Sequence, residues 1–350
     1  MKICIVGTSR CGTTLLRSIL NKNPAISFFN ETHWIPKMYE FFGMQSVDWR
    51  DMLSVAKNTT WDSGKDLFTV NLQYSKYEDV AVLLNDFEAA LRIHNKVNIQ
   101  QFSNILADIL FDSPVDWGDK TPDYGYYMDM IQQIFPDCKF IHVTRDGLAT
   151  ARSMSKHSGC QLMISGGYHN WCSLSHDKFY EKFNIVSLPM TSYIKSWAIR
   201  MNRIRDESKR LKKNSYMEIS YENILNQPKK VLEEIECFAQ LPATFTGNDI
   251  SILGINKNKL KPATELTSEL VNLTPDELRL LNNGYGKCYF KEFASVQELY
   301  LEFNKAKKII LSDPKDAVLS CISLLASPLS QTESELELKT KELLNAIKIL

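Results

Sequence analysis

The first residues with recognisable chemistry form the loop GTSRCGTT, residues 7–14. Gly7 and Gly12 are separated by four residues, as in a Walker A loop, whose backbone N–H groups hold phosphates and whose Lys reaches the terminal phosphates. Thr13 stands at the position of that Lys, and Arg10 lies inside the loop. The spacing therefore predicts a phosphate-binding loop that works without the Walker lysine.

The sequence on either side of this loop has the pattern of a strand followed by a helix. Residues 2–6, KICIV, are a short apolar run typical of a buried strand. Apolar residues then recur at helical spacing in residues 13–23, TTLLRSILNKN. A helix that begins directly after such a strand presents free N–H groups and its positive dipole end to an anion. This context favours an anion site over a simple tight turn.

Two further strands are predicted downstream. KFIHVT, residues 139–144, is followed by a turn at Arg145 and by a helical pattern that contains Ser153, eight residues after Arg145. A third strand pattern, within residues 215–224, contains Tyr221. Strands that alternate with helices predict a parallel sheet covered by helices. The expected fold class is α/β: a P-loop-like parallel sheet flanked by helices, with a helical C-terminal extension.

The composition narrows the possible partners and compartments. Forty-one basic and 41 acidic residues give no net charge, so no overall field attracts nucleic acid or an anionic membrane. No apolar run approaches the roughly 18–20 residues of a membrane span, and the N-terminal sequence does not read as a leader. The eight cysteines show neither C-x-x-C pairs nor zinc-ligand spacing. We therefore expect a cytoplasmic protein with no metal, no membrane partner and no nucleic acid partner.

Several separated stretches together resemble the sulfotransferases that use 3′-phosphoadenosine-5′-phosphosulfate (PAPS). GTSRCGTTLL resembles their 5′-phosphosulfate loop, and TRDGLATARS resembles their 3′-phosphate element. Residues 117–146 resemble the Lys-Thr-Pro segment that precedes this element, and residues 218–242 resemble the family's Tyr-Glu strand and following helix. The resemblance extends over residues 1–290. It implies PAPS as sulfuryl donor, adenosine 3′,5′-bisphosphate (PAP) as product, and no metal requirement.

The resemblance also implies which residues hold the donor. The 5′ side would be held by Thr8, Ser9, Arg10, Cys11, Gly12, Thr13 and Thr14. Arg145 and Ser153 would bind the 3′-phosphate, since a guanidinium suits bidentate phosphate contact. Tyr221 would lie near the adenine, the alternative being an ordinary buried tyrosine. The family usually has Ser where this chain has Cys11, a poorer hydrogen-bond donor, so a contact from its backbone amide is the one expected there.

The catalytic base is expected in SFFNETHWIP, residues 27–36, where Glu31 follows Arg10 by 21 residues. This segment resembles the Glu-Thr-Arg segment that carries the catalytic glutamate of tyrosylprotein sulfotransferases, with His33 in place of the Arg. Glu31 and His33 are both candidates; the register favours Glu31, whereas His33 has the more convenient ordinary pKa, about 6.5. Lys120 and Arg10 would neutralise charge on the sulfuryl or bridging oxygen. The alternative for Lys120 is a solvated loop lysine.

The remaining expectations concern the acceptor and the domains. Residues 1–290 would form the PAPS-binding domain, with acceptor-pocket or cap insertions at 45–115 and 155–195. Residues 291–350 would form a helical extension that could form a homodimer.

A leaderless chain fits a small-molecule acceptor. The accepting group would be a hydroxyl or amine of a metabolite or natural product, as in secondary metabolite biosynthesis. Tyrosyl-peptide or carbohydrate acceptors are alternatives. A small-molecule kinase and a non-catalytic nucleotide-binding protein are alternatives of other classes; a kinase should have the P-loop Lys.

Two further stretches of the sequence have more than one possible role. His157, His169 and His176 flank a Gly- and aromatic-rich segment. It is better suited to an acceptor-binding loop than to a metal site. Lys257, Lys259 and Lys261 occupy the place of the family's basic loop over the 3′-phosphate but lack its Gly-Arg pattern.

Overall fold

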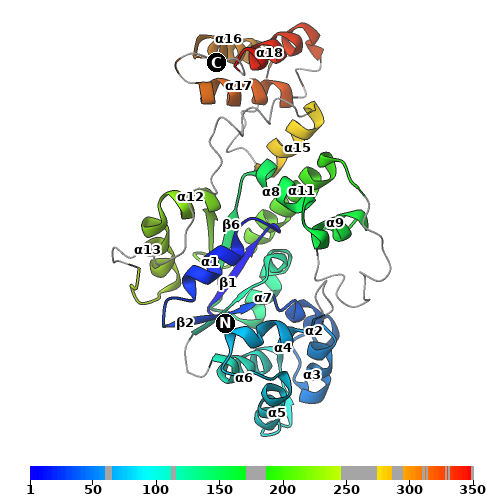
Figure 1. The fold of residues 1–350 in the computed structure, drawn as a ribbon, viewed down its shortest axis with the longest axis vertical. Coiled ribbons are helices and arrows are strands. Elements are labelled where there is room, and N and C mark those ends of the chain that lie inside the picture. The colour runs from blue at the N-terminus through cyan, green and yellow to red at the C-terminus, as the bar shows by residue number, and fades with distance from the viewer. Residues whose placement is uncertain are drawn as a thin grey trace. The chain divides into compact units, whose positions relative to one another are not determined.

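A computed structural model describes most of the chain. The described residues are 1–59, 65–111, 116–170, 187–245, 274–285, 295–309, 312, 314–327, 329 and 332–347. They divide into two compact units (Figure 1). Unit 1 comprises Met1–Arg145, Lys156–Ser187 and Arg203–Asn256. Unit 2 comprises Asp146–Ser155, Leu188–Asn202 and Lys257–Leu350.

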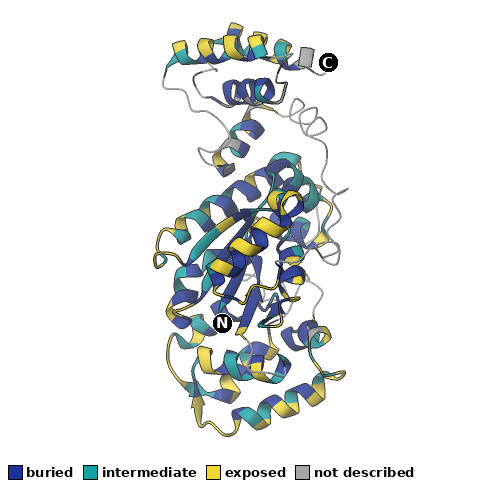
Figure 2. Ribbon diagram, turned by 90° about the vertical axis from the view of Figure 1, so that its left-hand side faces the viewer, coloured by how far each residue is buried: buried dark blue, intermediate teal, exposed yellow. Residues whose placement is uncertain are grey.

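A five-stranded parallel sheet in the order β2-β5-β1-β6-β7 forms the centre of unit 1. Its strands are β1 (Ile3–Gly7), β2 (Ile26–Asn30), β5 (Asp116–Lys120), β6 (Lys139–Thr144) and β7 (Tyr216–Ser220). The predicted parallel α/β sheet is thereby confirmed. β1, the first strand, is central and buried along its whole length, and the strands are mostly dark blue in Figure 2.

Helices and short helical turns surround the sheet within unit 1. These are α1 (Thr13–Leu20), α2 (Trp34–Phe42), α3 (Trp49–Lys57), α4 (Leu67–Asn71), η1 (Leu72–Tyr74), α5 (Val80–Leu91), α6 (Ile99–Phe111), η2 (Pro122–Tyr126), α7 (Met128–Ile134), α9 (Ser158–Ser165), α12 (Tyr221–Asn226) and α13 (Pro228–Ala239). β3 (Val47–Asp48) and β4 (Lys96–Val97) form a small antiparallel ribbon. Helices α2 to α6 lie together in the lower part of Figure 1 and supply much of one apolar core.

Two strands of the central sheet, β2 and β5, were not predicted from the sequence. β5 reads DWGDK, and its Asp119 and Lys120 are buried charged residues that break any apolar pattern. Gly118 has a steric role there, because a Cβ on it would come within 2.3 Å of the Phe28 ring on β2. Tertiary contacts, not local hydrophobicity, therefore determine β5.

Unit 2 is helical in its described part. It contains α8 (Gly147–Ser155), the first part of α11 (Met190–Ser208), α15 (Pro275–Tyr285), α16 (Val296–Ile309), α17 (Pro314–Ala326) and α18 (Ser334–Ile347). Trp197 on α11 is fully buried, and a Cβ on Gly147 or Gly284 would come within 2.7 or 2.3 Å of its ring. Trp197 is therefore a core residue. Leu299, Leu324 and Leu336 join α16, α17 and α18 in a core of their own, which confirms the helical C-terminal extension.

Among the helices that the structure describes, none combines the length and apolar composition needed to span a membrane.

Candidate functional site

The carboxyl ends of three adjacent strands bring most of the predicted site residues to one edge of the sheet. β1 pairs with β5 on one side, where Ile5 is opposite Lys120. It pairs with β6 on the other side, where Gly7 is opposite Val143. Lys120, the loop after Gly7, and Arg145 therefore follow one another along this edge. In open parallel sheets, ligands bind at the carboxyl ends of the strands.

The loop between β1 and α1 has a backbone suited to an anion. Arg10 and Gly12 have left-handed conformations, with φ of 68° and 105°. Successive N–H groups in such turns form a concave anion-binding surface. Gly12 precedes α1 and has no side chain with which to cap it, so the first-turn amides are open to a ligand. The exposed side chains of Arg10 and Thr14 add a guanidinium and a hydroxyl.

Three other side chains of this loop are buried, those of Thr8, Cys11 and Thr13. Cys11 is fully buried, and its Sγ lies 2.6 Å from where a Cβ on Gly7 would be. Its thiol therefore packs against the strand end. Thr8 is also fully buried, and its Oγ1 has no hydrogen-bond partner in the described structure. An orphaned hydroxyl beside an anion cradle is a donor that a bound oxyanion could satisfy.

Arg145 and Tyr221 contact this loop. The Arg145 Nη1 donates to the Arg10 carbonyl oxygen at 3.1 Å, and its guanidinium lies 4.6 Å from the Tyr221 ring centroid. A Cβ on Gly12 would come within 2.3 Å of that ring. Tyr221 begins α12 and is 8% exposed, so it serves here as a buried support for the loop and for Arg145. Ser153 is on α8, in unit 2.

Glu31, Thr32 and His33 form a strained connection between β2 and α2. Glu31 and His33 have positive φ values of 41° and 57°, and such residues cluster at functional sites because the strain needs support from the surroundings. The Glu31 carboxylate forms an ion pair with Lys120, and its Oε2 lies 3.7 Å from the His33 Nε2. The side chain of Glu31 is 26% exposed, whereas those of His33 and Lys120 are 5% and 1% exposed. Glu31 is thus the candidate base that a ligand can reach.

The charges around Glu31 determine how it can act. Burial disfavours its charged form, but the Lys120 ammonium and the His33 imidazole more than offset this, and the pKa of the Glu31 carboxyl lies well below its ordinary value. Glu31 is therefore ionised in this arrangement and is a weak base while Lys120 remains paired with it.

A buried hydrogen-bond network that sequence reasoning missed fixes this segment. Asp119 accepts from the Thr32 and Thr121 hydroxyls, each at 2.6 Å. The Thr32 N–H donates to the Thr121 Oγ1 at 2.9 Å. The Tyr124 Oη lies 2.6 Å from the Thr32 Oγ1 and accepts from the Ile35 N–H at 3.2 Å.

This network has one charged member. Burial raises the pKa of Asp119 to about 6, against the opposing effect of its two hydroxyl donors. Asp119 is next to Lys120 in the sequence, but nothing in the sequence alone shows that it faces Thr32. Its place under the Glu31 segment makes it a positioning residue.

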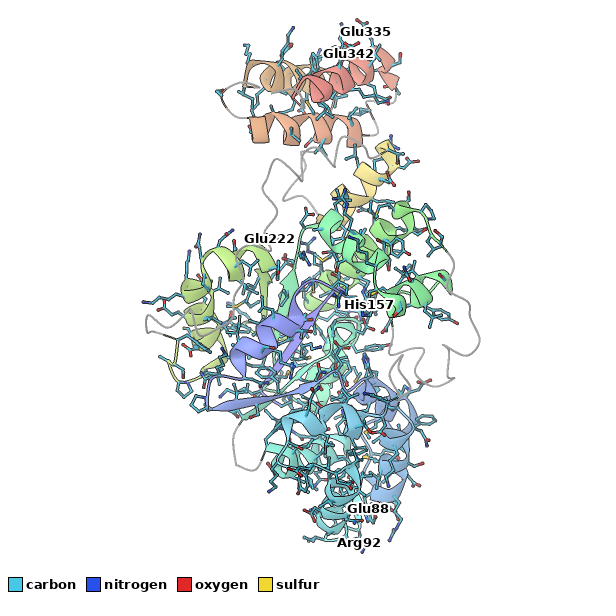
Figure 3. The ribbon with its side chains drawn as sticks, in the orientation of Figure 1. Glu88, Arg92, His157, Glu222, Glu335 and Glu342 are labelled. Atoms are coloured by element: carbon cyan, nitrogen blue, oxygen red, sulfur yellow. The ribbon has the colours of Figure 1, made fainter. Side chains whose placement is uncertain are left out.

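The histidines have other roles in the described structure. His142 is fully buried, and its Nδ1 lies 2.7 Å from the Tyr216 hydroxyl. His157 precedes α9 (Figure 3), where its Nδ1 accepts from the Cys160 N–H at 3.3 Å. His169 lines a cavity. Within the described ranges no group of His, Cys, Asp and Glu side chains is arranged to hold a metal ion.

Some predicted residues lie outside the described part of the chain: His176, Lys257, Lys259 and Lys261.

Comparison with known proteins identifies one family. A family model described as "Sulfotransferase family" matches residues 2–245. No curated protein matches the chain.

The chain is also similar, at low sequence identity, to several solved structures. The sulfotransferase domain from the curacin biosynthetic pathway is 18% identical, with 69% of this chain and 74% of that chain covered and a TM-score of 0.46. The sulfotransferase domain from the Synechococcus PCC 7002 olefin synthase is 16% identical, with 81% and 94% covered and a TM-score of 0.46. Mouse sulfotransferase SULT7A1 complexed with PAP is 14% identical, with 90% and 86% covered and a TM-score of 0.31.

Proposed function

Because this chain belongs to the sulfotransferase family, we propose that it moves the sulfuryl group of PAPS to a hydroxyl or amine of a small-molecule acceptor. One observation carries the proposal: the Glu31–Lys120 pair and the loop after Gly7 lie at the same edge of the sheet. That edge offers an anion site, a reachable carboxylate and a buried ammonium, which are the groups that sulfuryl transfer needs.

The residues present fit a donor with phosphate groups at both ends of its ribose. The amides of residues 10–14, the Thr8 hydroxyl and the Arg10 guanidinium suit the 5′ end, since together they offer neutral and charged donors. Arg145, stacked on Tyr221, is the candidate for the 3′-phosphate, with Ser153 as its sequence-predicted partner. The donor supplies an activated sulfuryl group, which carries less negative charge than a phosphoryl group and needs no Mg²⁺.

Glu31 is the proposed base, because it is the more exposed of the two candidates. Its carboxylate takes the acceptor proton as the acceptor oxygen or nitrogen bonds to sulfur. The bond from sulfur to the bridging oxygen breaks, and that electron pair leaves with PAP. Lys120 and Arg10 balance the charge on the transferring group and on the leaving oxygen. His33, buried behind Glu31, orients the carboxylate.

Lys120 has a second role in this mechanism. While its ammonium pairs with Glu31, the pKa of the carboxyl stays low and proton abstraction is weak. If the ammonium turns toward the sulfuryl oxygens of a bound donor, Glu31 loses its main charge partner and becomes a stronger base. Basicity would then increase only when the donor is in place.

The experiment is a transfer assay with radiolabelled PAPS, or with ATP and Mg²⁺, and a panel of phenols, alcohols and amines. We expect labelled product from PAPS alone, with loss of product in Glu31→Gln. Product from ATP instead would favour the kinase alternative, which the absence of a Lys at Thr13 opposes. The cytoplasmic location, the homodimer and the acceptor-pocket insertions remain predictions from the sequence.

A further inference from the structure

Unit 1 contains a cavity of about 310 Å³ beside the segment that follows Lys120. Its walls come from the junction of η2 and α7, from the residues after α9, and from α11. The side chains that matter below are Tyr126, Tyr127, Tyr168, His169, Asn170 and Arg203. Its volume is at the lower end of the range for small-molecule sites, roughly 300–1,000 Å³.

The walls of the cavity are fixed by direct contacts. Asn170 Nδ2 donates to the Tyr127 Oη at 2.7 Å, which joins the residues after α9 to the start of α7. A Cβ on Gly125 would come within 2.6 Å of Ile204, so η2 lies close against α11 next to Arg203. The cavity is therefore framed by ordered contacts between three separate segments.

The charge around the cavity favours an anion. None of its described lining residues is an Asp or Glu. Glu207 pairs with Arg203 at 3.1 Å and with Arg210 at 3.2 Å, and it also accepts from the Asp129 N–H at the start of α7 at 3.4 Å. One buried carboxylate thus faces two guanidinium groups and a helix N-terminus. Exposed Asp206 also lies near Arg203 and Arg210, but it does not line the cavity, so Arg203 supplies the charge that a ligand in the cavity would meet.

The cavity is linked to the candidate base through η2. This element begins two residues after Lys120 and ends at Tyr126, which lines the cavity. Within it, the Tyr124 Oη contacts the Thr32 Oγ1, next to Glu31 in the sequence, at 2.6 Å. A short helical turn therefore connects the base segment to the cavity wall.

We propose that this cavity is the acceptor site and that the acceptor is an anionic aromatic compound, of the class of phenolic carboxylates. The proposal rests on the proposed function. The tyrosine rings offer flat surfaces for an aromatic ring, and the Arg203 guanidinium binds the carboxylate. His169 and the Tyr127 hydroxyl complete the polar contacts.

The test uses three phenols that differ in charge: 4-hydroxyphenylacetate, 4-methylphenol and tyramine. Each is titrated calorimetrically into the full chain with PAP present. We expect the anion to bind about tenfold more tightly than the neutral and cationic phenols, as for a charge-assisted contact. Arg203→Gln should remove this preference, and Arg203→Lys should restore part of it.

Arg210→Gln is the matched control, because Arg210 pairs with the same Glu207 but does not line the cavity. It should keep the preference for the anion. Equal binding of the three phenols, no binding of any, or the same loss in both Gln variants would overturn the acceptor proposal. Titration with PAP alone tests the donor separately. If the chain binds PAP but does not distinguish the three phenols, only the acceptor proposal fails. If it binds the anionic phenol through Arg203 but does not bind PAP, only the sulfotransferase mechanism fails.

Discussion

Lys120 and Glu31 form an ion pair at the carboxyl ends of β5 and β2, although the Lys120 side chain is almost fully buried and that of Glu31 is open to a ligand. Asn30, the residue before Glu31, is the register partner of Lys120 in the sheet, so the pairing of the two strands sets this contact. A buried ammonium beside a reachable carboxylate gives the site a carboxylate whose pKa depends on the position of the ammonium.

Removal of Lys120 should move the pH profile of the enzyme. Lys120 lowers the pKa of Glu31, whereas burial raises it. Lys120→Met removes the lowering effect and keeps the burial, so the pKa of Glu31 should rise. Glu31 must be ionised to accept a proton, and activity is lost as the pH falls through its pKa. The acid limb of kcat/KM should therefore appear at higher pH in Lys120→Met than in the wild type.

Lys2→Met is the control for this shift. Lys2 pairs with Asp116, at the opposite end of β5, at 2.6 Å. Its removal should leave the acid limb in place. An unmoved limb in Lys120→Met would mean that Glu31 is not the titrating base.

Replacement of the two candidate bases should separate them. Glu31→Gln keeps the shape and a hydrogen bond to Lys120 but cannot take a proton. We expect kcat to fall about 100- to 10,000-fold, as for the loss of a general base, with PAP affinity unchanged. His33→Asn should have a smaller effect, because His33 is buried behind Glu31. Steady-state kinetics of both variants checks this, and the reverse order would assign the base to His33.

Asp119 should leave a signature in the pH dependence of stability. Burial raises its pKa from 3.8 to about 6, so the folded state binds more protons than the unfolded state between these values. Its contribution to stability therefore falls as the pH rises through this window, by about 3 kcal/mol in all. Asp119→Asn does not titrate and should lack this component.

The measurement is urea unfolding at several pH values between 3.5 and 7, values chosen to bracket the window from about 4 to about 6. The difference in unfolding free energy between wild type and Asp119→Asn should change across the window. A constant difference would contradict a buried, titrating Asp119.

Thr32→Val removes one of the hydroxyl donors to Asp119. It should lower kcat more than it raises KM, because it loosens the Glu31 segment.

Gly12 should tolerate no side chain. Its φ of 105° and the nearness of the Tyr221 ring both oppose a Cβ. Gly43 has a positive φ of 56° but nothing within 4 Å of a Cβ, so Gly43→Ala measures the backbone cost alone. Thermal unfolding should show a larger loss of stability for Gly12→Ala than for Gly43→Ala, and calorimetry should show weaker PAP binding in Gly12→Ala alone. Equal effects would mean that the contact with Tyr221 is unimportant.

Local patterns in the sequence predicted the elements that carry the loop. The apolar run before Gly7 and the run at residues 139–144 appear as β1 and β6. β5 escaped prediction because its buried charged residues, Asp119 and Lys120, interrupt its apolar character. β2, ISFFN, carries no charge and is the strand that pairs with β5.

The contacts between side chains of the site could be identified only from the tertiary structure. Sequence reasoning selected Glu31 and Lys120 separately, but their ion pair depends on strand register across 89 positions of the chain. The contact of Tyr221 with Gly12 and Arg145 likewise joins three distant segments. The Asp119 network was missed because Thr32, Thr121 and Tyr124 carry no pattern that relates them.

The most direct test of the central claim is a calorimetric titration of the chain with PAP, ATP and 5′-AMP, with and without Mg²⁺. A PAPS-dependent enzyme should bind PAP tightly without metal, bind ATP and 5′-AMP far more weakly, and lose the PAP preference in Arg145→Ala. Equal or tighter binding of ATP, especially with Mg²⁺, would contradict the sulfotransferase mechanism and favour a kinase.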